Sequence, residues 1–108
     1  MAKWTNIGSV DDFPPGCQVC LEPGTQPLVV FNINGKLIAA ANTCPHAGLP
    51  VGEGELAGVV LTCPFHGYAF NLETGANVDA PDTEAPLTMF PIRQTADGKV
   101  TVDLAPEP

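Results

Sequence analysis

The chain has only two histidines, and each lies beside a cysteine in a short cluster of similar pattern. Cys44 and His46 form the first cluster with one residue between them, and Cys63 and His66 form the second with two residues between them. Thiolate sulfur and imidazole nitrogen are protein ligands of zinc and of iron–sulfur centres. Four such side chains in two matched pairs therefore predict a metal centre to which each cluster contributes one thiolate and one imidazole.

Two kinds of metal centre are compatible with these ligands. Zinc often binds two cysteines and two histidines, but it usually takes each pair of like ligands from one short segment. Here each segment mixes the two ligand types, and a spacing of one residue is tight for two bonds to one ion. In a two-iron cluster both thiolates hold one iron and both imidazoles hold the other, so each segment bridges two metals. The spacing therefore favours a [2Fe–2S] cluster and leaves zinc as the alternative.

Beyond the four ligands, the chain resembles the Rieske ferredoxin family. The likeness begins with the spacing Cys44-x-His46-x16-Cys63-x2-His66 and with the proline that follows each cysteine. It extends to Gly48 in the first loop and Gly67 in the second, and it covers nearly the whole chain. The other stretches that carry it are NGKLIAAANTCPH before the first loop, FNLETG after the second loop and PLTMFPI near the end.

The resemblance implies a role for each ligand. Cys44 and Cys63 would bind the inner iron, and His46 and His66 the outer iron, of one Rieske-type [2Fe–2S] cluster per chain. The imidazole edges would lie near the surface, where an electron can leave. Because both histidines are then committed to the cluster, no histidine pair remains for the non-haem iron site of an oxygenase.

The same resemblance implies a one-electron carrier and not an enzyme. It would accept electrons from a flavin- or NAD(P)H-linked reductase and pass them to a terminal Rieske oxygenase, such as a ring-hydroxylating dioxygenase or a related monooxygenase. Apolar residues near the histidines would belong to the docking surface, namely Leu49, Pro50, Phe65 and Pro81. Two alternatives stay open: the small Rieske-like subunit of a nitrite reductase, and a zinc-stabilised interaction module.

Residues around the ligands indicate a low reduction potential. Two ferric ions, two sulfides and two thiolates sum to about zero formal charge, which raises the potential above that of plant-type ferredoxins, into a range of about −150 to +300 mV. High-potential respiratory members brace the two loops with a disulfide, where this chain has Leu49 or a neighbour, and Phe65. They also place serine and tyrosine hydroxyls near the sulfurs, where this chain has Tyr68 and Phe70. We therefore expect the soluble, low-potential class.

The composition restricts the partners. Twelve carboxylates against four basic residues give a formal net charge of −8, which argues against binding to nucleic acid or to an anionic membrane. An acidic protein is instead steered toward a partner with a positive docking face. The chain has no apolar run long enough for a membrane helix, and its first residues lack the apolar stretch that is typical of a secretory signal. We expect a cytoplasmic protein and a monomer.

The two clusters need rigid elements to position them, and the sequence predicts strands. Twelve prolines and eleven glycines disfavour long helices. The clearest element is a hairpin over residues 28–41 with a two-residue turn at Asn34-Gly35. This turn would place Phe31 opposite Ile38. Further strands are expected at residues 4–8, 17–21, 59–62 and 68–71.

The remaining segments complete an all-β chain. Residues 52–58 are rich in glycine and are expected to be a connection. A final hairpin is expected to pair residues 88–93 with residues 99–104. We therefore predict one domain over residues 1–108 with a small antiparallel Rieske fold. It would have a base like a β-sandwich or barrel and a cluster-binding subdomain over about residues 42–82.

A second cysteine motif, Cys17-x-x-Cys20, invites a redox interpretation. Thioredoxin-like chemistry needs such a pair at a helix N-terminus, whereas this pair lies in a predicted strand. Residues three apart in a strand point to opposite faces and lie too far apart for a disulfide. We expect two free thiols, with one or both buried.

Overall fold

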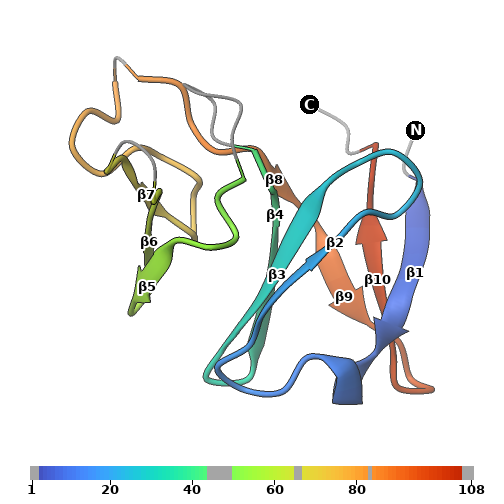
Figure 1. The fold of residues 1–108 in the computed structure, drawn as a ribbon. Coiled ribbons are helices and arrows are strands. Elements are labelled where there is room, and N and C mark those ends of the chain that lie inside the picture. The colour runs from blue at the N-terminus through green and yellow to red at the C-terminus, as the bar shows by residue number, and fades with distance from the viewer. Residues whose placement is uncertain (1–2, 44–49, 65–66, 83, 106–108) are drawn as a thin grey trace.

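The structure of the chain is a computed structural model that describes residues 3–43, 50–64, 67–82 and 84–105. These residues form three antiparallel sheets and one short 3₁₀ helix, the all-β architecture predicted from the sequence (Figure 1). Within these ranges no helix is long and apolar enough to cross a membrane. In chain order the elements are β1 (Trp4–Ser9), η1 (Val10–Asp12), β2 (Gln18–Leu21), β3 (Leu28–Ile33), β4 (Lys36–Ala41), β5 (Glu55–Ala57), β6 (Val60–Thr62), β7 (Ala69–Asn71), β8 (Met89–Phe90), β9 (Ile92–Gln94) and β10 (Lys99–Asp103).

The central sheet has the strand order β2-β3-β4-β8 and is built around the predicted hairpin. Asn34 and Gly35 both have positive φ angles, of 54° and 93°. This is the backbone conformation that a two-residue type I′ turn requires. The turn sets the register, and Phe31 pairs with Ile38 as predicted.

The second sheet has the strand order β1-β10-β9, and the prediction for the final hairpin was wrong in one respect. Residues 88–93 were expected to form one strand, but Pro91 divides them into β8 and β9. Because proline has no N–H group, it cannot continue a ladder of backbone hydrogen bonds. Before it, Met89 pairs with Ala40 of the central sheet, and after it Ile92 pairs with Val102 of β10. The segment therefore passes from one sheet to the other.

The third sheet has the strand order β5-β6-β7. Residues 52–58 were predicted to be only a connection, and this was wrong. This segment contains β5, in which Leu56 pairs with Leu61 of β6. The neighbouring glycines hid this strand in the sequence, because glycine is unfavourable in strands.

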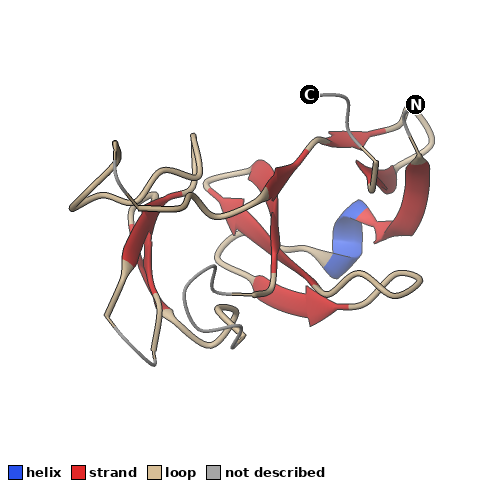
Figure 2. Cartoon of the chain, turned by 90° about the horizontal axis from the view of Figure 1, so that it is seen from above, coloured by secondary structure: helices blue, strands red, loops and turns tan. Residues whose placement is uncertain are grey.

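The three sheets are stacked as layers, with the central sheet in the middle (Figures 1 and 2). Strand β3 is buried on both faces because its residues alternate between two hydrophobic cores. Val29 and Phe31 pack in one core with Leu61 and Phe70 of the third sheet. Leu28 and Val30 pack in the other core with residues of β10, namely Val100 and Val102. The central sheet thus supports the strands on which the predicted site depends.

Candidate metal centre

Cys63 is the predicted ligand that lies within the described residues. It directly follows β6, and only 1% of its surface is exposed, because it packs in the core with Leu61 and Phe70. Its backbone N–H donates a hydrogen bond to the carbonyl of Tyr68 (2.7 Å), and its carbonyl accepts one from the N–H of Gly67 (3.1 Å). These bonds close the β6–β7 connection tightly and fix the backbone of the second Cys/His loop at its base.

The other predicted ligands, Cys44, His46 and His66, lie outside the described residues. The ligand set as a whole therefore stays a prediction. The same holds for Leu49 and Phe65 of the predicted docking surface, whereas Pro50 and Pro81 are described and exposed. Among the residues with a described placement, no three cysteine, histidine or acidic side chains are grouped in a way that could hold a metal ion.

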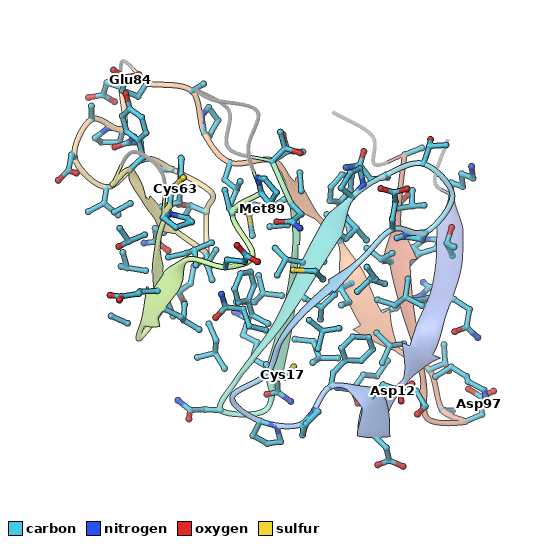
Figure 3. All side chains as sticks on the ribbon, in the orientation of Figure 1. Asp12, Cys17, Cys63, Glu84, Met89 and Asp97 are labelled. Carbon is cyan, nitrogen blue, oxygen red and sulfur yellow. The ribbon has the colours of Figure 1, made fainter. Side chains whose placement is uncertain are left out.

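An open cavity of about 400 Å³ lies beside Cys63, whose side chain is labelled at the end of the molecule that carries the third sheet (Figure 3). Cys63 contributes to its wall, and a thiolate in such a position is the soft donor that iron–sulfur clusters take. Glu53 and Glu55 line the same cavity and are exposed to solvent. The described part of the site therefore fits an iron–sulfur cluster bound at the protein surface. The lining residues are Glu53, Glu55, Thr62, Cys63, Pro64 and Gly67.

Tyr68 and Phe70, the positions compared with hydroxyl-bearing residues of high-potential members, lie in and beside β7. Phe70 is fully buried and has no group that could donate a hydrogen bond to a sulfur. Tyr68 is half-buried and packs against the same core as Cys63. This placement agrees with the low-potential interpretation of the sequence.

Two polar residues near the site were missed by the sequence analysis. Gln18 of β2 and Asn42, which follows β4, both form hydrogen bonds to the backbone of Gly52. Gly52 belongs to the segment that follows the first Cys/His loop. No local pattern in the sequence could have paired these residues, because 34 positions separate Gln18 from Gly52.

Cys17 and Cys20 are both free thiols, as predicted. The expectation that at least one is buried was wrong, since Cys17 is half-buried and Cys20 is exposed. Cys17 directly precedes β2, the edge strand of the central sheet, and the residues of β2 are half-buried or exposed. Desolvation by the surrounding core raises the pKa of the Cys17 thiol. Figure 3 places Cys17 far from Cys63, so this thiol does not belong to the metal centre.

Comparison with known proteins gives matches over most of the chain. The family model for the Rieske [2Fe-2S] domain matches residues 3–96. The anthranilate 1,2-dioxygenase ferredoxin subunit of Burkholderia cepacia is 33% identical over 104 residues, which cover 96% of this chain and 94% of that subunit. The predicted Rieske-type [2Fe–2S] cluster is therefore confirmed as the cofactor.

Solved structures agree with the fold. A chain from a complex of reduced oxygenase and oxidised ferredoxin in carbazole 1,9a-dioxygenase superposes with a TM-score of 0.80 at 35% identity, covering 93% of this chain and 92% of that chain. A structure from Mycobacterium tuberculosis, assigned as an NADH-dependent nitrite reductase small subunit, has a TM-score of 0.82 at 23% identity and covers 99% of both chains. At that identity the second likeness concerns the fold alone. On the family match and the ferredoxin relatives together, this chain belongs to the Rieske [2Fe-2S] domain family.

Proposed function

We propose that this protein is the ferredoxin component of a multicomponent oxygenase system. It accepts one electron from a flavin- or NAD(P)H-linked reductase and delivers it to a terminal Rieske oxygenase. The supporting observation is that the match covers 94% of a dioxygenase ferredoxin subunit. The likeness thus extends over the ferredoxin itself and is not confined to a Rieske domain within a larger enzyme. The protein transfers electrons and does not itself act on the organic substrate.

In this proposal the four predicted ligands hold the cluster. Cys44 and Cys63 supply the thiolates, and His46 and His66 supply the imidazoles, while the bound cluster provides one-electron chemistry. The protein provides position and environment. The buried Cys63, fixed by the backbone bonds of the β6–β7 connection, supports this assignment on the side of the second loop.

The distribution of charge supports docking at the end of the molecule that carries the third sheet. Residues 53–84, which form this sheet and the loop after it, contain six carboxylates and no lysine or arginine. All four basic residues lie elsewhere, at Lys3, Lys36, Arg93 and Lys99. An acidic surface around the electron-exit site steers an oxygenase with a basic face toward it.

The proposal includes the sequence predictions for the domain organisation, the oligomeric state and the cellular compartment. One domain over residues 1–108, with a cluster-binding subdomain over about 42–82, is supported by the separate third sheet and by the core that it shares with the central sheet. A monomer in the cytoplasm stays a prediction. Sedimentation of the holoprotein would measure the oligomeric state.

The proposal is tested by electron transfer between purified proteins. The dithionite-reduced protein should reduce the oxidised terminal oxygenase of an anthranilate or carbazole dioxygenase system in stopped-flow experiments. The second-order rate should fall as salt is added, since salt screens the steering charges. Glu53→Gln with Glu55→Gln should lower the rate at low salt, whereas Asp11→Asn, on η1 at the other end of the molecule, should leave it unchanged.

A failure of electron transfer to the oxygenases would distinguish this proposal from the alternative subunit. A reduced protein that passes no electron to either oxygenase but reduces the catalytic subunit of a nitrite reductase would overturn the proposal in favour of the alternative subunit. Colour and metal content check the cofactor independently, because an iron–sulfur protein is red-brown and a zinc protein is colourless.

A further inference from the structure

The side chain of Gln18 forms two long-range hydrogen bonds beside the metal centre. Its Nε2 atom donates to the carbonyl of Gly52 at 2.7 Å and to the carbonyl of Gly54 at 2.9 Å. Both glycines are buried, so neither carbonyl has free access to water. A buried carbonyl that loses its partner carries the full cost of desolvation, and one amide group satisfies both of these.

Asn42 holds the same segment from the other side. Its Oδ1 atom accepts a hydrogen bond from the N–H of Gly52 at 2.7 Å, and its own backbone N–H donates to the carbonyl of Pro27 at 3.0 Å. Asn42 lies two residues before Cys44, and Gly52 follows the first loop. The Asn42–Gly52 bond therefore joins the two ends of the segment that carries Cys44 and His46.

The segment held by Gln18 also contacts the second loop. A Cβ atom built on Gly54 would lie 2.2 Å from the carbonyl oxygen of Thr62, so the two backbones touch. Thr62 directly precedes Cys63. The chain from Gly52 to Gly54 is thus the place where the base of the first loop meets the base of the second.

We propose that Gln18 is a positioning residue that sets the separation of the two Cys/His loops through its bonds to Gly52 and Gly54. It acts by holding the junction on which both loops rest, with Asn42 as its counterpart on the other side of Gly52. The inference rests on the proposed ligand set, because the geometry that Gln18 controls is that of Cys44 and Cys63.

The test compares holoproteins that differ in this one amide group. Gln18→Met keeps the length of the side chain and removes both hydrogen bonds. We expect shifted g values in the electron paramagnetic resonance spectrum of the reduced protein. We also expect release of the cluster to a chelator to be about tenfold faster, the effect of losing two hydrogen bonds to buried carbonyls. Gln18→Asn keeps the amide group on a shorter side chain. Its g values and its rate of cluster release should lie between those of the wild type and those of Gln18→Met.

The matched control is Asp103→Leu, in the β1-β10-β9 sheet on the other side of the central sheet. The Oδ1 atom of the buried Asp103 accepts hydrogen bonds from the N–H groups of Lys3 at 2.7 Å and Ala105 at 3.0 Å, so this variant also removes two hydrogen bonds, but none that involves Gly52 or Gly54. We expect wild-type g values and wild-type cluster release. A residue that only stabilised the fold would change unfolding without moving the g values, which report the geometry of the ligands.

Four outcomes would be decisive. Shifted g values in Gln18→Met but not in Asp103→Leu support the inference, and wild-type values in both overturn it. If Gln18→Met does not accumulate as holoprotein, Asn42→Leu removes the bond on the other side of Gly52, and unchanged g values there likewise overturn it. If the wild-type protein itself gives no Rieske-type signal, the proposed ligand set has failed and not the role of Gln18.

Discussion

The sulfur atom of Cys20 lies against the backbone of Gly52: a Cβ atom built on Gly52 would be 2.3 Å from Cys20 Sγ. The same Cβ would lie 3.0 Å from Oδ1 of Asn42. Strand β2 therefore passes directly beside the segment that follows the first Cys/His loop. Glycine is needed at position 52 for close approach, and Cys20 acts as a small packing group there and not as half of a redox pair.

We expect Gly52→Ala to destabilise the protein by about 1–3 kcal/mol, the usual cost of overpacking a buried site. The added methyl group would push against Cys20 Sγ and against the hydrogen bond from Asn42. Denaturant unfolding, followed by circular dichroism and by cluster absorbance, would measure the loss.

A double-mutant cycle tests this cause. Cys20→Ala removes the sulfur atom, so the double variant Gly52→Ala/Cys20→Ala should recover part of the stability. If the two effects are simply additive, the contact with Cys20 is not what restricts position 52.

We expect Gly54→Ala to be more harmful than Gly52→Ala. The atom that its methyl group would meet is the backbone carbonyl of Thr62, at 2.2 Å, which cannot move without displacing the residue before Cys63. The variant should bind less cluster, measured as iron per protein, as well as unfold more easily. Cys20→Ala should give no rescue here, and a Gly54→Ala protein with full cluster content would contradict this account.

These glycines show what sequence reasoning could and could not predict. The hairpin was predictable because Asn34-Gly35 specifies its turn locally. The spacing of two cysteines and two histidines predicted the iron–sulfur cofactor, whereas the four ligands themselves stay a prediction. The packing of Gly52 was not predictable, since it depends on β2, which lies more than 30 positions earlier in the chain. The division of the last segment at Pro91 was missed for a similar reason: both halves are strands, and only tertiary pairing assigns them to different sheets.

The midpoint potential is expected near the lower end of the range of about −150 to +300 mV known for Rieske centres. Phe70 is fully buried and offers no hydroxyl that would stabilise the reduced cluster. The six carboxylates of residues 53–84 also disfavour the added electron. Protein-film voltammetry measures the potential directly, and a value well above zero would show that this interpretation is wrong.

The charge contribution can be separated from that of Phe70. Replacing both cavity-lining carboxylates, Glu53→Gln and Glu55→Gln, should raise the potential slightly, because less negative charge then opposes reduction. The increase should shrink at high salt, since both side chains are exposed. An increase that does not depend on salt would point to a structural change at the second loop instead.

Alkylation should distinguish the two cysteines of the Cys17-x-x-Cys20 motif. Burial raises the pKa of the Cys17 thiol, so at any pH near 8 a smaller fraction of this sulfur is thiolate than in an unperturbed cysteine. Because the thiolate is the nucleophile, Cys17 should react with iodoacetamide only at higher pH. Cys20 is exposed and should be modified first. Mass spectrometry of peptides from holoprotein treated across a pH series would follow both sites, with Cys17→Ser as the control for assignment. Modification of Cys17 before Cys20, or a disulfide between them after mild oxidation, would contradict the placement of Cys17 just before β2 and of Cys20 within it.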